Sequence, residues 1–319
     1  MIHARDLTRN FKTKAGPVDA VRGISLDVKE GELVAFLGPN GAGKSTSVRM
    51  LTTLLPPSSG SASVGGHDVI SEPAAVRRKI GYVGQGTASG PYHRVRDELV
   101  TQGRAQRMST GAAKRRADEL LGMLELDGLG GRDASSLSGG QKRRLDVALG
   151  LMHTPPILFL DEPSTGLDPH SRANLWEHIL KIRKQSGMTI FLTTHYLDEA
   201  DAMAERVMII DNGVMIADDT PERLKADLAG DTIAIHVLCE DQAGGAAEIA
   251  QNLPGALDTR ADRREISVTL KDGEAVLPEF IRRLHQAGIE AMTASVKRPT
   301  LDDVFLGLTG RSLREAAAA

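Results

Sequence analysis

The chain has 319 residues and a mass of 34.1 kDa, which is enough for two domains of ordinary size. Hydrophobic residues make up 41% of the sequence and charged residues 25%, so the chain can bury a substantial core and is not globally disordered. A net charge of −3 and only 3% aromatic residues argue against a nucleic-acid-binding protein, which usually has a basic excess or stacking aromatic side chains.

Sequence composition also argues against membrane-spanning, secreted, disulfide-bonded and metal-binding proteins. No stretch approaches the roughly 20 consecutive apolar residues of a membrane-spanning helix. The first residues, Met-Ile-His-Ala-Arg-Asp, contain no apolar segment, so a secretory signal is not expected. Cys239 is the single cysteine and the nine histidines are dispersed, so neither an internal disulfide nor a protein-built metal site is expected.

The first part of the chain predicts strands that alternate with helices. Residues 24–28 alternate apolar and polar side chains, and residues 33–37 form a continuous apolar run that ends at Gly38, as in a strand buried on both faces. Such alternation indicates an α/β fold with a mainly parallel sheet. The later elements are expected as a helix at 45–55, a strand at 157–160, a helix at 170–184 and a strand at 189–193.

The pattern changes twice further along the chain. Residues 112–126 are rich in Ala, Leu, Arg and Glu at helical spacing, and with the helix after Leu137 they predict a helical insertion at about 87–150. A small α+β domain is expected over 229–319, after a first domain over 1–228. Its elements resemble a split β-α-β domain, with strands at 232–239, 264–270 and 289–296, helices at 243–252 and 275–287, and a last short helix at 301–308.

Residues 38–45 match the phosphate-loop pattern G-x-x-x-x-G-K-[ST] between a predicted strand and a predicted helix. Glycines let backbone N–H groups surround phosphate oxygens, and the following helix adds the positive end of its dipole. Lys44 would bridge the β- and γ-phosphates, and the Ser45 hydroxyl would be a Mg²⁺ ligand. A plain glycine-rich turn is the weaker interpretation in this context. The predicted nucleotide-binding residues are Gly38, Pro39, Asn40, Gly41, Ala42, Gly43, Lys44, Ser45 and Thr46.

Two further motifs carry charge or anion-binding groups. The apolar strand at 157–160 ends in Asp161 and Glu162, which a buried parallel strand delivers to the ligand-binding edge of the sheet. Asp161 would then hold Mg²⁺ and Glu162 would polarise an attacking water, whereas a solvated turn is the alternative. The sequence Leu-Ser-Gly-Gly-Gln at 137–141 precedes a basic helix and exposes glycine N–H groups, although in isolation a loop followed by a helix cap is the better interpretation.

Taken together, these motifs resemble the ATP-binding cassette (ABC) ATPases, the nucleotide-binding subunits of ABC transporters, over about residues 1–228. Gln85 looks like the Q-loop glutamine, Asp168 closes a D-loop-like segment, and His195 looks like the switch histidine. The resemblance implies a P-loop NTPase with a RecA-like core sheet and a helical subdomain.

The resemblance also implies roles for these residues, with ATP and Mg²⁺ as cofactors. Two cassettes close head to tail, and ATP lies between the Walker A loop of one, which corresponds to residues 38–45, and the signature of the other, which corresponds to residues 137–141. Mg²⁺ is approached by Ser45, Gln85 and Asp161, while Glu162 orients or deprotonates water and His195 contacts the γ-phosphate. Ser138 and Gly140 are implied to touch the γ-phosphate of the ATP of the opposite subunit, and Gly139, Gln141 and Asp168 are also expected to bind nucleotide.

Two aromatic residues have different expected roles. Phe11 resembles the aromatic residue that stacks on adenine in this family, although its spacing to Val21 is long and a phenylalanine ending a first strand is often part of the core. Trp176 shares helical spacing with Ile179 and Ile182, which favours core packing.

The C-terminal residues indicate which subgroup of the ABC ATPases the chain resembles. Residues 299–310, Pro-Thr-Leu-Asp-Asp-Val-Phe-Leu-Gly-Leu-Thr-Gly, look like the C-terminal motif of daunorubicin/doxorubicin-resistance-type ATPases. This implies the ATPase subunit of an efflux transporter that exports drugs, antibiotics or other hydrophobic compounds. The implied partners are integral membrane permease subunits and a second ATP-binding subunit in a homodimer, without nucleic acid, at the cytoplasmic face of the cell membrane.

Two other functions share the same motifs. One is the cassette of a lipid or polysaccharide exporter, and the other is a soluble ABC-type ATPase of translation or DNA repair. If 301–308 is only an amphipathic helix that caps the second domain, the C-terminal argument for drug export weakens. The second domain itself is expected to regulate the cassette or to brace its dimer, and the sequence does not identify the exported compound.

Overall fold

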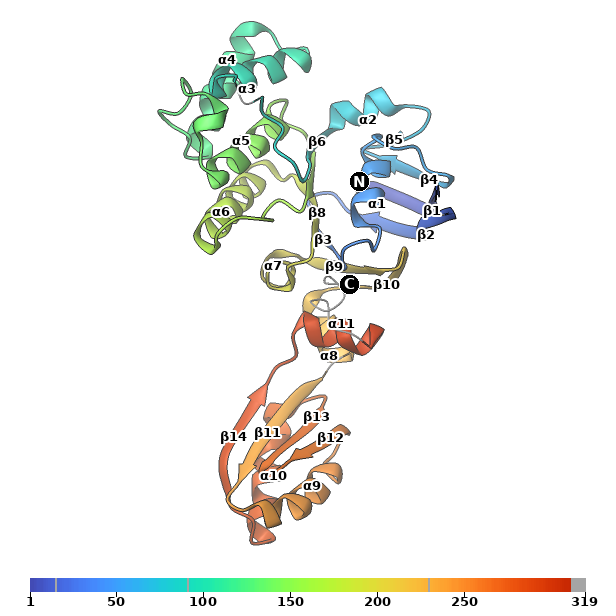
Figure 1. Ribbon diagram of the computed structural model, residues 1–319, viewed down its shortest axis with the longest axis vertical. Coiled ribbons are helices and arrows are strands. Elements are labelled where there is room, and N and C mark those ends of the chain that lie inside the picture. Colours follow the sequence, from blue (N-terminus) through green and yellow to red (C-terminus); the bar gives the residue numbers. More distant parts are fainter. Residues whose placement is uncertain (15, 91, 229, 311–319) are drawn as a thin grey trace. The chain divides into compact units, whose positions relative to one another are not determined.

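The computed structural model describes residues 1–310 except 15, 91 and 229 (Figure 1). The chain forms two compact units, Met1–Asp218 and the residues from Asp219 onward, with the division earlier than the expected position after residue 228. Each unit has its own hydrophobic core. No helix in the described part of the chain combines the length and apolar character that crossing a bilayer requires.

The first unit contains an antiparallel sheet made from the N-terminal strands. Its order is β2-β1-β4-β5, and β1 pairs with both β2 and β4. The apolar side chains of this sheet, such as Leu7 and Val21, point into the core that it shares with the central sheet. The strands are β1 (Ile2–Thr13), β2 (Gly16–Val28), β4 (Ser59–Val64) and β5 (His67–Asp68).

The central sheet has the order β10-β9-β3-β8-β7-β6, and β9, β3, β8, β7 and β6 are parallel. Every residue of β3, β7 and β8 is buried, as the continuous apolar runs predict. Their carboxyl ends lead into the phosphate loop, the acidic pair and His195 respectively. The strands are β3 (Leu33–Leu37), β6 (Ile80–Val83), β7 (Ile157–Asp161), β8 (Thr189–Thr194), β9 (Arg206–Asp211) and β10 (Val214–Asp219).

Helices cover both sides of this sheet. Figure 1 shows α1 and α2 with the N-terminal sheet on one side, and the green helices α3 to α6 on the other. The helices are α1 (Lys44–Leu51), α2 (Pro73–Lys79), α3 (Val95–Ala105), α4 (Thr110–Met123), α5 (Gly139–Leu151), α6 (Pro169–Ser186) and α7 (Leu197–Met203), with a 3-10 turn at Ala134–Ser136.

Two helix boundaries differ from the sequence prediction for local reasons. The helix predicted at 45–55 ends at Leu51, because Thr53 adopts a left-handed backbone with φ 64°. The helix predicted at 112–126 spans Thr110–Met123, because the Ser109 side chain caps its start and Glu125 is left-handed beyond its end. Trp176 is buried on α6 beside Ile179, as predicted.

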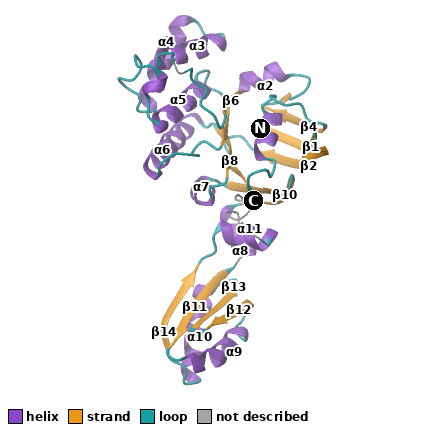
Figure 2. Cartoon of the chain, viewed as in Figure 1, coloured by secondary structure: helices purple, strands orange, loops and turns teal. Residues whose placement is uncertain are grey.

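The second unit has the order β12-β13-β11-β14, and its paired strands are antiparallel. The chain order β-α-β-β-α-β confirms the split β-α-β expectation, with one strand that the sequence analysis missed. Helix α9 packs against β12 and β13, and α10 packs against β11 and β14 (Figure 2). The elements are α8 (Pro221–Leu228), β11 (Asp231–Val237), α9 (Ala243–Gln251), β12 (Ala256–Asp262), β13 (Glu265–Leu270), α10 (Gly273–Gln286), β14 (Ala291–Lys297) and α11 (Leu301–Thr309), with a 3-10 turn at Glu240–Gln242.

The missed strand β12 lies at the edge of this sheet. It has no buried residue, and its Leu257 is 64% exposed, so it lacks the apolar alternation that reveals a strand. The final helix α11 begins as predicted, because Thr300 and Asp303 form a reciprocal capping box.

Because each unit has its own core, a substitution in one core should destabilise that unit and leave the other unit folded. Phe280 on α10 is fully buried in the core of the second unit, so Phe280→Ala should lower the free energy of unfolding of that unit by about 3–5 kcal/mol. Hydrogen exchange should then accelerate in residues 231–297, whereas β3, β7 and β8 keep their protection. Ile281→Ala, one residue along and 40% exposed, is the matched control with little expected effect. Uniform loss of protection across both units would contradict two independent cores.

Candidate functional site

The loop between β3 and α1 is tightly confined by neighbouring backbone. Gly41 and Gly43 adopt left-handed conformations with φ 81° and 106°. A Cβ on Gly43 would lie 2.6 Å from the carbonyl oxygen of Ala20, and one on Gly38 would collide with the carbonyl of Ile210. Glycine is therefore required at these positions, both for the backbone angles and for the close approach. The loop delivers the start of α1, with its unpaired N–H groups, to the edge of the sheet.

Lys44 is the buried cation at the centre of this loop, with only 4% of its surface exposed. Its Nζ donates hydrogen bonds to the carbonyls of Gly38 (2.6 Å) and Pro39 (3.1 Å) and lies 3.3 Å from Oε1 of Glu162. Burial lowers the pKa of Lys44, and the carboxylates of Glu162 and Asp161 oppose this shift. The free chain thus holds this cation with its own oxygen atoms.

Asp161, Ser45 and Gln85 come together at the end of β7. The Ser45 hydroxyl donates to Oδ1 of Asp161 (3.0 Å), and the Gln85 amide donates to the Ser45 hydroxyl (3.0 Å). Thr193 on β8 donates to the same Oδ1 at 2.6 Å and fixes the carboxylate from the other side. These hard oxygen donors suit Mg²⁺, which usually takes a few protein ligands together with phosphate oxygens. Among the described residues, no group of three or more His, Cys, Asp or Glu side chains is arranged to hold a metal ion.

Glu162 occupies a strained position beside Lys44. Its φ of 48° lies in the left-handed region, which is uncommon for a residue other than glycine. Its Oε2 lies 3.4 Å from Nδ1 of His195, and the hydroxyl of Thr165 donates to the same oxygen at 3.4 Å. The contact with His195 and the charge of Lys44 lower the pKa of Glu162 to about 2, against the effect of burial. The carboxylate is therefore ionised at neutral pH.

The signature residues form a helix start elsewhere in the unit. Ser138 caps α5 by accepting a hydrogen bond from the Gln141 N–H (3.3 Å), and the Gln141 side chain accepts one from the Ser138 N–H (2.9 Å). Gly140 abuts Ser171, since a Cβ on it would lie 2.8 Å from the Ser171 hydroxyl oxygen. Ser171 in turn donates to the carboxylate of Asp168, which caps α6. The signature residue Gly140 and the D-loop residue Asp168 are thus linked through Ser171.

The structure brings some predicted site residues together and leaves others apart. One pocket of about 280 Å³ is lined by the phosphate loop, Gln85 and Glu162, and also by Ala20, which the sequence analysis missed. Among the residues that the structure describes, neither Phe11 nor any of 138–141 lines this pocket. Phe11 is half-buried on β1, opposite Val18, and the Arg9 guanidinium lies 4.8 Å above its ring. The lining residues from the loop are Pro39, Asn40, Gly41, Gly43, Lys44, Ser45 and Thr46.

Two contributors carried no usable signal in the sequence. Ala20 is a small residue on a strand, and nothing in its neighbourhood predicts contact with a phosphate pocket. Thr193 was assigned only to a buried strand, although its hydroxyl sits between the Asp161 carboxylate and the Glu162 N–H. Both reach the site because β2 and β8 flank the phosphate loop and β7.

Comparisons with known proteins agree with this geometry. Residues 21–165 match the family described as ABC transporter, and residues 220–309 match the family described as ATP-binding protein DrrA1-3-like, C-terminal domain. The chain is 43% identical over 304 residues to a daunorubicin resistance ATP-binding protein of Streptomyces coeruleorubidus, with 95% of each chain covered. It is 42% identical over 300 residues to the doxorubicin resistance ATP-binding protein of Mycobacterium tuberculosis, covering 92% of this chain and 89% of that one.

A more distant relative and a solved structure extend the comparison. The chain is 36% identical over 318 residues to a Nod factor export ATP-binding protein of Rhizobium etli, covering 97% of this chain and 93% of that one. Its fold is similar to that of an ATP-binding cassette solved as a dimer in a post-hydrolysis state bound to ADP and Pi. That similarity has a TM-score of 0.64 and 27% identity and covers 69% of this chain and 98% of the other.

The low pKa of Glu162 predicts an acid-dependent stability. The ionised carboxylate stabilises the fold fully above about pH 4.5, where it is also ionised in the unfolded chain, and this contribution is lost as the pH falls toward 2. At pH 7, Glu162→Gln should cost about 2 kcal/mol, because the buried Lys44 loses its anionic partner. The difference between the two proteins should shrink between pH 4.5 and 2, as measured by urea unfolding of the nucleotide-free chains. A constant difference over that range would contradict the assignment, and Glu177→Gln, at an exposed site on α6, serves as control.

Proposed function

The chain belongs to the ATP-binding subunits of ABC transporters of the daunorubicin/doxorubicin-resistance type, and from this premise we propose that it powers the efflux of a drug, antibiotic or other hydrophobic compound through separate transmembrane subunits. It is an ABC ATPase that consists of an ATP-binding cassette followed by the C-terminal domain of that type. The observation that carries the proposal is the convergence of Lys44, Ser45 and Glu162 on one pocket in a chain of this family.

The proposed chemistry is hydrolysis of ATP at this pocket. Lys44 and the N–H groups of residues 38–46 bind the phosphates, and Mg²⁺ held by Ser45, Asp161 and Gln85 would neutralise charge on the phosphate oxygens. Glu162 accepts a proton from, or orients, the attacking water, and His195 steadies the Glu162 carboxylate through Nδ1.

The low pKa of Glu162 bears directly on this role. A carboxylate with a pKa of about 2 is a weak base, because the contact with His195 and the charge of Lys44 stabilise its ionised form.

A second copy of the chain is the proposed source of the missing anion-binding groups. The Ser138 hydroxyl and the N–H groups at the start of α5 line no part of the phosphate pocket of their own chain, so they are available to the nucleotide of a neighbouring copy. Closure around ATP favours the dimer because ATP binds the closed state better than the open one. The membrane subunits would respond to that equilibrium, and the proposed location is therefore the cytoplasmic face of the cell membrane.

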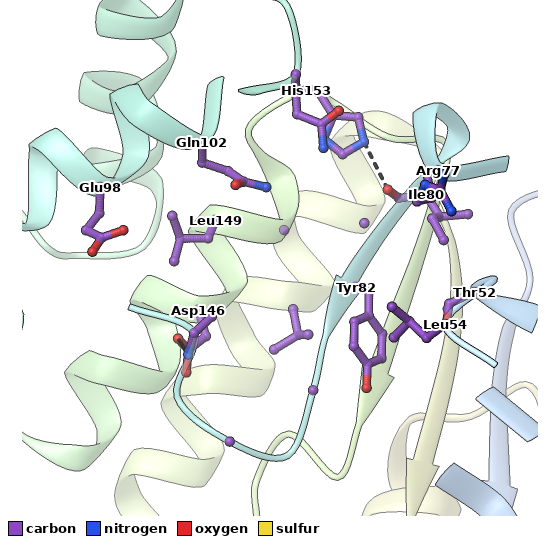
Figure 3. A pocket seen from close by; sticks show the side chains of 17 residues that line it. Thr52, Leu54, Arg77, Ile80, Tyr82, Glu98, Gln102, Asp146, Leu149 and His153 are labelled. Carbon is purple, nitrogen blue, oxygen red and sulfur yellow. Dashed lines mark hydrogen bonds between the residues drawn. The ribbon is translucent and has the colours of Figure 1, made fainter. Parts of the chain in front are cut away.

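The proposed contact with the membrane subunits is a pocket of about 260 Å³ between the central sheet and helices α3 and α5 (Figure 3). Its walls include Gly84 and Ala88 on either side of Gln85, and Glu98, Gln102 and Leu149 on the helices. Figure 3 shows Gln102 and Leu149 on one side of β6 and Tyr82 beside Leu54 on the other, and all four side chains line the pocket. A cytoplasmic segment of a permease that enters it would touch the Gln85 loop directly.

Export of a lipid or a polysaccharide is the alternative, and similarity to a Nod factor export ATP-binding protein indicates that relatives of this chain are not confined to drug resistance. Efflux assays separate the two. Cells or inverted vesicles that contain the chain with its membrane subunits should remove a fluorescent anthracycline at the expense of ATP. Retained ATPase activity without anthracycline transport would reject the drug-export assignment and favour the alternative.

Glu162→Gln should lower kcat for ATP by about 100-fold or more while ATP binding persists, because the variant keeps the shape of the side chain and loses its basicity. Size-exclusion chromatography with Mg²⁺-ATP should then reveal a trapped dimer. Glu177→Gln should behave as the unmodified chain in both assays. Turnover by Glu162→Gln at the unmodified rate would remove Glu162 from the mechanism.

A large side chain in the pocket of Figure 3 should impair assembly with the membrane subunits and leave ATP hydrolysis intact. Gln102 on α3 lines the pocket, whereas the neighbouring Thr101 is exposed on the same helix outside its lining. Gln102→Trp should leave the basal ATPase activity of the chain within about twofold and reduce its assembly with the membrane subunits about tenfold or more, since the indole occupies the hollow. Thr101→Trp should leave both unchanged. Equal assembly of the two variants, measured by co-purification, would place docking elsewhere.

A further inference from the structure

Arg143 is a buried cation on the inner face of the signature helix α5. Only 7% of its surface is exposed, although it stands in a run of three basic residues with Lys142 and Arg144. Its guanidinium points under the helix and not toward solvent, where such a run would usually place its charges. A buried guanidinium requires partners for its donors, because burial without them costs a large desolvation free energy.

Backbone carbonyls from two separate segments provide these partners. Nε of Arg143 donates to the carbonyl of Pro163 (2.6 Å), and Nη2 lies 3.4 Å from the carbonyls of Asp161 and Glu162. Nη1 donates to the carbonyl of Gly84 at 2.7 Å. One side chain therefore holds both the backbone that carries the proposed base and the residue that precedes Gln85.

Asp146, one turn further along α5, completes the arrangement. It is 3% exposed, its Oδ2 lies 3.7 Å from Nη1 of Arg143, and its Oδ1 accepts a hydrogen bond from the Ala88 N–H at 2.9 Å. The Gln85 loop is thus fixed at both ends from the same helix, by Arg143 at Gly84 and by Asp146 at Ala88. Burial raises the pKa of Asp146 and lowers the pKa of Arg143. The charge of Arg143 opposes the shift of Asp146, and the charge of Asp146 opposes the shift of Arg143.

The conformation of Glu162 explains why such support matters. Its left-handed φ of 48° stores backbone strain, which persists only where the surroundings fix it. On one side, its N–H donates to the carbonyl and hydroxyl oxygens of Thr193. On the other side, Arg143 binds the carbonyls from Asp161 to Pro163. Removal of Arg143 frees one side of this strained residue.

We propose that Arg143, held by Asp146, is a positioning residue for ATP hydrolysis that sets the backbone of Glu162 and the Gln85 loop in a single arrangement. The inference rests on the proposed function of the site. Because Asp146 also lines the pocket proposed for the membrane subunits (Figure 3), an occupant that moves Asp146 shifts Arg143 and, through it, the base and the Mg²⁺-side amide together.

Arg144 is a matched control on the same helix. Its side chain is 14% exposed, donates to the carbonyl of Leu124 (3.0 Å) and lies 3.6 Å from the carboxylate of Glu125. It is therefore a partly buried, hydrogen-bonded and ion-paired arginine, as Arg143 is. None of its described hydrogen bonds or ion pairs involves the Gln85 loop or residues 161–163.

The test compares Arg143→Gln, Arg143→Lys, Asp146→Asn and Arg144→Gln in the full chain, at a temperature well below the Tm of every variant. Arg143→Gln should lower kcat at least about tenfold and leave KM and the Kd of a fluorescent ATP analogue within about twofold, because only the alignment of the base is lost. Arg143→Lys, which keeps the charge without the fork of donors, should fall between, and so should Asp146→Asn. Arg144→Gln should keep kcat within about twofold.

Hydrogen exchange gives a second readout that does not depend on turnover. Peptides covering 84–88 and 161–165 should exchange faster together in Arg143→Gln and not in Arg144→Gln, because one side chain supports both segments. If Arg143→Gln does not fold, Arg143→Lys carries the same comparison.

Unchanged kcat in folded Arg143→Gln, an equal loss in Arg144→Gln, or exchange that accelerates in only one segment would overturn the proposal. An unmodified chain that neither binds nor hydrolyses ATP, alone or with its membrane subunits, would instead reject the proposed function. In that case the exchange data still decide whether Arg143 joins the two segments.

Discussion

Burial of opposite charges at the end of an apolar sheet is the constraint on which the rest of the site depends. Strands β3, β7 and β8 are buried throughout, so the residues that follow them have little access to water. Lys44 and Glu162 are 4% and 9% exposed and must each find a partner within the protein. Their 3.3 Å contact, the loop carbonyls around Lys44 and the approach of His195 to Glu162 are consequences of that requirement. In the proposed reaction, nucleotide phosphates would take over part of the contact that Glu162 makes with Lys44 in the free chain.

The same requirement operates a second time, beneath the signature helix. Arg143 and Asp146 are buried as a pair, and they satisfy their remaining donors and acceptors with the backbone of two loops. A buried cation of this kind favours one conformation of the two loops, since few other conformations would place carbonyl oxygens within reach of its N–H donors. The pocket at the phosphate loop and the pocket proposed for the membrane subunits are therefore connected by polar contacts and not by apolar packing alone.

The sequence predicted those parts of the molecule that depend on local pattern. Continuous apolar runs identified β3, β7 and β8, and helix-cap residues identified the start of α11. The phosphate-loop pattern identified most of the residues that line the pocket, namely 39–41 and 43–46. Features that depend on tertiary contacts were not predictable. The edge strand β12 buries no side chain, and the left-handed Thr53 ends α1 within a segment of helical composition. In the run 142–144, composition alone does not reveal that Arg143 turns inward, and the pairing of Lys44 with Glu162 joins residues far apart in the chain.

The contact between Gly140 and Ser171 has a mechanical consequence. The glycine leaves no room for a side chain, and Ser171 is hydrogen-bonded to the Asp168 carboxylate, so the starts of α5 and α6 form one stiff corner. In a dimer of the proposed kind, a rotation that carried residues 137–141 toward the second copy would therefore move residues 164–168 with them. A larger residue at Gly140 would disturb the starts of both helices at once.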